Sequence, residues 1–368
     1  MFDVNRLNWP ARGDINAWAD FVETLCIFNK DTVLSLEDFA DFLTDDASKK
    51  SKDILSAINF NENFLAPLSV ATTPFKTFLT LKKDEEDEED REDDFSGEDE
   101  YNKAKEDIRS RLITLFNFLQ ARKEYFKEFY PFEVSPKETI ISYINRENQT
   151  MLHKLYQVLL FSSEMNLYTP GDINRIGHLF ESLCKRPFYQ LVPAIAEKRF
   201  FGAGGGVIIR SDYLGDLKHK IQALAGDLYI NTNPDIDDPD ELGSTGDAGL
   251  DWVAWVGFED ESTHQPVYFG QCACGANWVD KQHETALSRW RNFLLLNQSV
   301  QCFHFMPRSF RRTSLEWFRK TAIVHELTLI DRFRLLKMFS LEDDEIITEA
   351  LAPYNDLLEE SANFYFTE

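Results

Sequence analysis

The chain has few cysteines, no long apolar run and fewer basic than acidic residues. Its 368 residues include five cysteines, an odd and scattered number, which argues against a disulfide framework and favours reduced thiols. No apolar run approaches the ~20 residues that a membrane-spanning helix needs. The first residues also lack the basic-then-apolar order of a signal peptide. We therefore expect a cytoplasmic protein without a membrane partner.

The net charge of −24, taken alone, argues against a nucleic-acid partner, because phosphate backbones bind basic surfaces. Its distribution weakens that exclusion. Residues 84–100 contain thirteen acids and one Arg, a net −12 that is half of the total. Residues 171–337 contain 19 basic and 21 acidic residues, a net of only −2. The second half of the chain is therefore compatible with binding DNA.

Composition and periodicity predict an α+β protein with two folded parts. Apolar residues three and four apart predict helices at 14–22 and 35–43, the latter with Ser35 as N-cap. The breaker at 169–171 marks the boundary between the parts. The expected divisions are a helical N-terminal domain (1–83), a disordered acidic linker (84–100), its helical continuation (101–169), a mixed α/β sheet domain (170–337) and an acidic C-terminal helix and tail (338–368).

Two of these divisions have alternative interpretations. The N-terminal helices fit a plain packing domain, and a winged-helix-like module or a protein-interaction adaptor is the alternative. The acidic linker is too polar to bury a core. It would either solubilise the chain or mimic nucleic-acid charge and hold a basic cleft shut.

The second part alternates helical and strand-like segments, which predicts a sheet with helices on both sides. The expected helices are 172–185, 213–229, 281–296 and 314–320. The expected strands are 250–258, 266–273, 300–306 and 324–330.

A glycine-rich loop, residues 246–250, delivers Asp251 to the start of a buried strand. On the following strand, the side chains of Val267, Phe269 and Gln271 lie on one face, and Cys272 lies on the opposite face with Gly270. A carboxylate among apolar neighbours needs a compensating cation or hydrogen bonds. Asp251, a second acid and the backbone carbonyl of Cys272 would supply oxygen ligands for Mg²⁺, or Mn²⁺ in its place.

Three short motifs resemble the helix Glu, Asp and Gln-x-Lys elements of Mrr-like restriction endonucleases, in the PD-(D/E)xK superfamily. They are Glu181 in Leu-Phe-Glu-Ser-Leu, Asp251 in Gly-Leu-Asp, and Gln271 in Phe-Gly-Gln-Cys. The segment Gln271 to Trp278 also resembles the Gln-Cys-Ala-x-Gly-x-Asn-Trp spelling of a group of uncharacterised bacterial proteins.

The resemblance covers residues 170–335 and implies a restriction-endonuclease-like domain with metal-dependent endonuclease activity on DNA. Asp251 would be the chief metal ligand, Glu181 a second acid, and Gln271 the substitute for the usual Glu. It also implies a bacterial restriction or anti-phage defence system with further protein partners, and a homo-oligomer is compatible with it.

The family lysine, which stabilises developing charge, is replaced by Ala273. Lys281 would fill the gap from the next helix, with Asn277 and His283 assisting. Alternatively Lys281 is a solvent-exposed first-turn residue. The chain would then be a catalytically inactive nucleic-acid-binding or assembly subunit on the same fold.

Five basic residues against one acid between 307 and 320 give a local charge of +4. Arg308, Arg311 and Arg312 would contact phosphates together with Asn277, and an ordinary basic helix face is the alternative. Cys272 and Cys274 also spell a possible zinc site. Thiols two residues apart on a strand are more simply explained by packing on one face.

Overall fold

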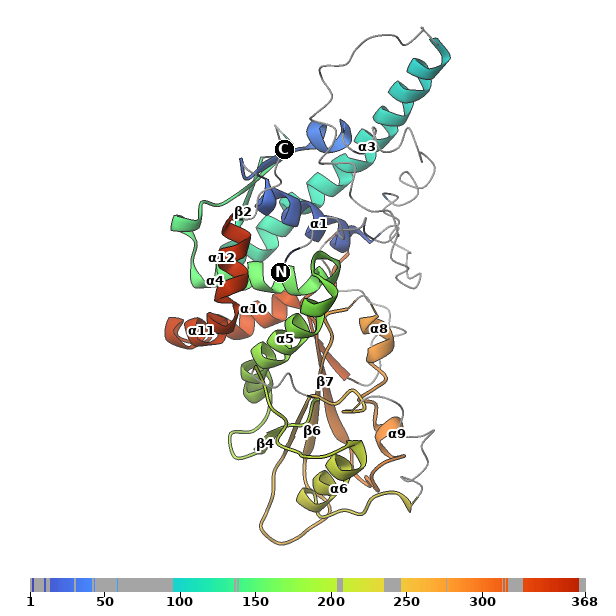
Figure 1. Ribbon diagram of the computed structural model, residues 1–368, viewed down its shortest axis with the longest axis vertical. Coiled ribbons are helices and arrows are strands. Elements are labelled where there is room, and N and C mark those ends of the chain that lie inside the picture. Colours follow the sequence, from blue (N-terminus) through green and yellow to red (C-terminus); the bar gives the residue numbers. More distant parts are fainter. Residues whose placement is uncertain are drawn as a thin grey trace. The chain divides into compact units, whose positions relative to one another are not determined.

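The computed structural model describes two compact units (Figure 1). Unit 1 comprises Met1–Thr169, Arg308–Phe318 and Tyr354–Glu368, and unit 2 comprises Pro170–Pro307 and Arg319–Pro353. The described residues are 2, 10, 14–29, 31–41, 43, 58, 95–135, 137, 139–203, 208–234, 246–275, 277–312, 314, 316 and 327–363. Within these residues no helix combines the length and the apolar character needed to cross a bilayer.

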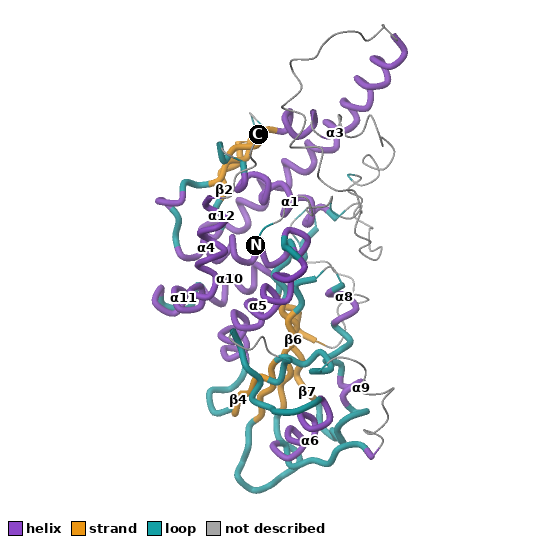
Figure 2. Tube along the Cα trace, in the orientation of Figure 1, coloured by secondary structure: helices purple, strands orange, loops and turns teal. Residues whose placement is uncertain are grey.

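Unit 1 is mainly helical, as Figure 2 shows in purple. Its α-helices are α1 (Ile15–Phe28), α3 (Phe95–Phe126), α4 (Met151–Ser163) and α12 (Asn355–Asn363), with short 3₁₀ turns at Lys127–Phe129, Arg146–Asn148 and Met165–Leu167. Asp14 caps α1 by accepting hydrogen bonds from the backbone N–H groups of Asn16 and Ala17. The predicted cap at Ser35 is confirmed: its Oγ accepts from Asp38 N at 3.0 Å, and residues 36–41 are helical.

Unit 1 also contains a sheet, so the prediction of a purely helical N-terminal part was wrong. Three antiparallel strands lie in the order β1 (Val33–Ser35), β3 (Ile140–Tyr143), β2 (Phe132–Ser135). They are only three or four residues long, too short for alternation to stand out from a helical pattern. The β-branched and aromatic content of β3 was the available signal.

Helix α3 begins at Phe95, inside the segment that was predicted to be a linker up to residue 100. Residues 84–94 of that segment lie outside the described residues. Farther along α3, the side chains of Ile108, Leu112 and Leu115 are fully buried. The apolar stripe of this later part packs into unit 1, and the helix extends from it back into the acidic segment.

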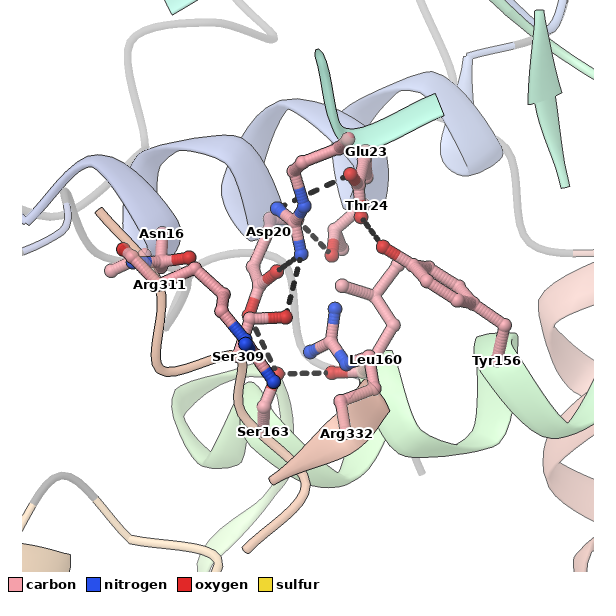
Figure 3. Close-up of polar contacts among 12 residues, drawn as sticks. Asn16, Asp20, Glu23, Thr24, Tyr156, Leu160, Ser163, Ser309, Arg311 and Arg332 are labelled. Carbon is pink, nitrogen blue, oxygen red and sulfur yellow. Dashed lines mark hydrogen bonds and ion pairs between the residues drawn. The ribbon is translucent and has the colours of Figure 1, made fainter. Parts of the chain in front are cut away.

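A buried ion cluster joins the helices of unit 1 (Figure 3). The guanidinium of Arg122 on α3 lies 2.7 Å from Asp20 Oδ1 and 3.2 Å from Glu23 Oε1, both on α1. Tyr130 and Tyr156 donate hydrogen bonds to the two oxygens of Glu23 at 2.7 and 2.9 Å. All three charged side chains are at most 1% exposed. Two carboxylates therefore share one cation, with hydroxyl groups supplying the remaining hydrogen bonds.

Unit 2 is built on a five-stranded mixed sheet in the order β4-β5-β6-β7-β8. The strands are β4 (Glu197–Phe200), β5 (Trp252–Trp255), β6 (Val267–Cys272), β7 (Val300–Phe305) and β8 (Leu327–Ile330). β5 is antiparallel to both of its neighbours, β4 and β6, whereas β6, β7 and β8 run parallel to one another. The sequence predicted every strand but β4, whose Glu-Lys-Arg content suits an edge position and hides the strand pattern.

Helices lie on both faces of this sheet, as predicted. On one face, Phe188 of α5 (Pro170–Leu191) stacks with Trp252 and closely approaches Gly270. On the other, Ile221 and Leu224 of α6 (Leu217–Asp227) share a core cluster with Phe269 and Val253. The predicted alternation of β6, with Val267 and Phe269 facing away from Gly270 and Cys272, is therefore confirmed.

The predicted helix 281–296 is not a single helix. It is replaced by two four-residue helices, α8 (Trp278–Lys281) and α9 (Leu287–Trp290). Trp290 lies in the core cluster and donates from its indole N–H to Glu284 O at 3.0 Å. Helices α10 (Arg332–Phe339) and α11 (Asp344–Leu351) follow β8. Most of the predicted helix 314–320 lies outside the described residues.

Candidate functional site

Asp251 lies directly before β5, where the chain enters the sheet. Its backbone N–H donates to Gly270 O at 3.0 Å, which sets it beside β6. One carboxylate oxygen, Oδ2, accepts a 2.6 Å hydrogen bond from the backbone N–H of Cys272. The residue is only 5% exposed. The prediction that Asp251 and Gln271 belong to adjoining strands is met, with Asp251 just outside the strand itself.

A tight turn made by residues 246–249 presents Asp251. Asp247 Oδ1 accepts from Gly249 N at 2.8 Å, and Leu250 N donates back to Asp247 O at 3.0 Å. Gly249 has a φ of +77°, a conformation that glycine adopts without strain. Asp247 therefore makes the turn, and its second carboxylate oxygen accepts a hydrogen bond from Ala203 N at 3.2 Å.

Glu181 and Asp247 lie close enough to Asp251 to act on its ionisation. Burial is the main cause that raises the pKa of Asp251 well above its usual value, and the negative charges of Glu181 and Asp247 add to it. The Cys272 N–H and the positive charge of Lys281 oppose the rise. Glu181 and Lys281 thus both act electrostatically on Asp251, although the three residues belong to separate segments of the sequence.

Glu181 is held on α5 by a neighbour one turn away. His178 Nδ1 lies 3.1 Å from Glu181 Oε2, and this hydrogen bond raises the pKa of His178. Beside them the thiols of Cys184 and Cys272 hydrogen bond to each other, and burial raises the pKa of both. Cys272 thus contributes its backbone N–H to Asp251 and its side chain to the contact with α5, in keeping with packing rather than zinc binding.

Gln271 projects from the opposite face of β6 and meets a different set of partners. Its Nε2 donates to Glu284 Oε2, and its Oε1 lies 3.2 Å from His304 Nδ1. Burial lowers the pKa of His304 to about 3, with Lys281 adding to the effect, so its ring is neutral. The grouping of Gln271 with Asp251 in one site stays a prediction: the strands are neighbours, and Gln271 has partners of its own in Glu284 and His304.

Glu284 is the acidic residue that sequence reasoning missed. It lies on the segment that links α8 to α9, and its side chain fills the space where a Cβ of Gly249 would stand. The signal available in the sequence was its position three residues after Lys281, in the segment that follows β6. Its carboxylate accepts a hydrogen bond from the Gln271 amide.

Lys281 ends α8 and is half-buried. Its positive charge acts on the ionisation of both Asp251 and His304. Asn277, at the N-cap of α8, and His283 are exposed. The alternative of a fully solvent-exposed Lys281 is not what the structure shows.

The three predicted phosphate contacts Arg308, Arg311 and Arg312 fall in unit 1, whereas Asp251 belongs to unit 2. Arg308 donates to the backbone oxygen of Ser163. Arg311 is only 9% exposed and lies 5.1 Å above the ring of Tyr125. Arg311 therefore presents too little surface for a phosphate. The phosphate contacts of Arg308 and Arg312 stay predictions.

Lys220 of α6 is a second cation that the sequence did not point out. It is 5% exposed, and its Nζ donates to Phe201 O and Gly202 O at 3.1 and 3.0 Å. The same short segment is fixed to Asp251, whose backbone oxygen accepts from Phe201 N and Gly202 N. Burial lowers the pKa of Lys220, and the negative charge of Asp247 opposes that change.

Within the part of the chain that the structure describes, no three His, Cys, Asp or Glu side chains form a preassembled metal cage. Comparison with protein-family models, curated proteins and solved structures found no match to this chain.

Proposed function

We propose that unit 2 is a metal-dependent DNA endonuclease of the restriction or anti-phage kind, which hydrolyses phosphodiester bonds. The observation that carries the proposal is the buried Asp251 carboxylate, whose pKa is raised beside two further acids, Glu181 and Asp247. A carboxylate in that environment is costly unless a cation joins it. The resemblance of the sequence around Glu181, Asp251 and Gln271 to Mrr-like nucleases supports the same conclusion.

The side chains present fit a hard divalent cation. Asp251 and Glu181 offer carboxylate oxygens, and the backbone carbonyl of Cys272 is the predicted third donor. Mg²⁺ is usually held by one or two carboxylates, and completes its shell with water and substrate phosphate oxygens. A cage of three protein side chains is therefore not required. When bound, the metal would activate water and stabilise charge on the phosphate.

The protein's own groups would complete the reaction. Lys281, coupled to Asp251, would bring a positive charge to the phosphate as negative charge develops on it. The Cys272 N–H fixes the orientation of the Asp251 carboxylate. Glu284 and the neutral His304 hold Gln271 from two sides, so this amide would position the end of β6 rather than move a proton.

A catalytically inactive, nucleic-acid-binding subunit is the second candidate. One observation favours it: Ala273, at the family's lysine position, is fully buried and presents no functional group. Under this alternative Lys281 would contribute to binding but not to rate.

The test is cleavage of plasmid DNA by the full chain with Mg²⁺ or Mn²⁺ and with EDTA. Asp251→Ala should remove metal-dependent cleavage, whereas Asp260→Ala, in an exposed loop, should cleave as wild type does. Lys281→Met should lower kcat by about 10²–10³ with little change in KM, the usual cost of one charge-stabilising group. Full cleavage by Asp251→Ala would overturn the proposal. DNA retention without cleavage by wild type would support the inactive subunit.

A further inference from the structure

A pocket of about 440 Å³ opens in unit 2 beside the segment that follows β4. Its lining includes Ala203, Arg210, Ser211, Tyr213, Lys220 and Gly246. The volume is within the ~300–1,000 Å³ range of small-molecule sites. None of these residues belongs to the catalytic group proposed above.

The pocket shares a wall with the candidate metal site. Ala203 lines the pocket and donates its backbone N–H to Asp247. The preceding residue, Gly202, donates to Asp251 O, and a Cβ built on it would lie 3.2 Å from Asp251 Oδ1. The segment Gly202-Ala203 therefore lies between the pocket, which Ala203 lines, and Asp251, which Gly202 contacts.

The charge of the pocket favours an anion. Lys220 is buried, and two of its three N–H donors are used by backbone carbonyls, which leaves one donor. No carboxylate of the described residues hydrogen bonds to this ammonium, so its charge is offset only in part, by Asp247 and by the Phe201 ring 5.6 Å from Nζ. Arg210 is exposed at the pocket, and no contact of its guanidinium with another described residue is found. A phosphate between the two cations would satisfy both.

The remaining walls suit a flat apolar group. The Tyr213 ring packs on Phe201 at 5.3 Å, and its hydroxyl donates to Asp227 at 2.8 Å, so the ring is fixed from both ends. Ile209 and Leu214 also line the pocket, and Leu214 is 69% exposed. The Tyr213 ring is only 5% exposed, so the exposed Leu214 side chain beside it offers the apolar surface against which a nucleobase would pack.

We infer that this pocket binds one nucleotide of the substrate strand, with its phosphate held by Arg210 and Lys220 and its base against Leu214. The inference rests on the proposed function, because the adjoining carboxylates would act on the neighbouring phosphodiester. The substrate of the proposed nuclease site would then be a DNA strand in which one nucleotide is unstacked from its neighbours and bound in this pocket.

The test is binding of thymidine 5′-monophosphate to the full chain, measured by calorimetry in EDTA so that no metal takes part. We expect thymidine, which lacks the phosphate, to bind at least tenfold more weakly. Arg210→Ala and Lys220→Met should each weaken nucleotide binding about tenfold, the equivalent of ~1.4 kcal/mol. Lys218→Ala is the matched control, since it removes the same charge from α6 outside the pocket lining.

Equal binding of thymidine and its monophosphate would overturn the inference, as would unchanged nucleotide binding by Arg210→Ala. Arg210 is exposed, so this variant decides the matter even if Lys220→Met fails to fold. A single-stranded oligonucleotide separates the two sources of the ligand: Arg210→Ala should weaken its binding too. Unchanged oligonucleotide binding would show a free-nucleotide site and overturn the strand assignment.

Cleavage and nucleotide binding fail independently. Wild type that binds the nucleotide but never cleaves DNA with Mg²⁺ or Mn²⁺ would refute the endonuclease and leave the pocket assignment standing. Metal-dependent cleavage by wild type with no nucleotide binding in EDTA would refute the pocket alone.

Discussion

Replacing Arg122 by Met should be among the most destabilising single changes in unit 1. The substitution keeps most of the side-chain volume but leaves Asp20 and Glu23 buried without their cation. Removing one partner of a buried ion pair costs about 3–5 kcal/mol, because the remaining charge stays desolvated. Tyr130 and Tyr156 still donate to Glu23. We therefore expect a loss of about 4 kcal/mol.

Urea denaturation followed by circular dichroism measures this loss. With a slope of about 2 kcal/mol per M, a 4 kcal/mol loss moves the midpoint by roughly 2 M. Arg109→Met is the matched control on the same helix, since Arg109 and Glu37 form an ion pair in which both side chains are about half exposed. Its cost should stay below about 1 kcal/mol.

A third variant tests the physical cause. Combining Arg122→Met with Asp20→Asn and Glu23→Gln removes the uncompensated charges and should recover most of the stability. If Arg122→Met costs no more than Arg109→Met, the buried cluster does not stabilise unit 1 as argued. If the triple variant is no more stable than Arg122→Met, lost packing rather than unpaired charge is responsible.

Three further predictions concern unit 2. Asp251→Asn should raise the Tm of the metal-free protein at pH 7–8. Because the pKa of Asp251 is raised in the folded state, its charge makes wild type less stable as pH rises from about 4. The gain in Tm should therefore shrink in acid, and a gain that does not change with pH would contradict the argument. Gly249→Ala should lower the free energy of unfolding by about 1–3 kcal/mol, because Gly249 has a φ of +77° and the new Cβ would lie 2.5 Å from Glu284 Cβ. Gly246→Ala is the control and should be nearly neutral in thermal unfolding, since a Cβ there would have no atom within 4 Å. Equal losses in the two variants would refute the reasoning. Burial lowers the pKa of His304 to about 3, so the stability of wild type should fall as pH drops from about 6.5 towards 3, by up to ~1.4 kcal/mol per pH unit. In His304→Asn the Tm should depend less on pH over that range. An unchanged dependence would assign the acid sensitivity to other groups.

Local pattern was enough to predict the framework of unit 2. Apolar segments bounded by breakers predicted β5, β6 and β7, and the alternation of β6 correctly separated Phe269 from Cys272. Helix α5 was predicted with its buried face, although it continues through Pro187. The edge strand β4 and the short sheet of unit 1 were missed, because neither carries an apolar pattern long enough to recognise.

The site was predicted in part. The glycine turn before Asp251 and the position of Glu181 on a helix were readable from the sequence. The partners of Gln271 were not, because Glu284 reaches it only once the expected helix 281–296 breaks into two short ones. Lys220 was also hidden, since its burial depends on the path of the segment after β4.

The sequence by itself determined the positions of β5, β6 and β7, the acid that follows the glycine turn at the start of β5, and the distribution of charge along the chain. These are local properties, set by turn geometry, alternation and composition. Only the tertiary structure decided which charges share a site. In the folded protein the charges of Glu181, Asp247 and Lys281 act on Asp251, and Arg311 belongs to unit 1. Electrostatic coupling depends on distance in space, which the order of residues along the chain does not fix.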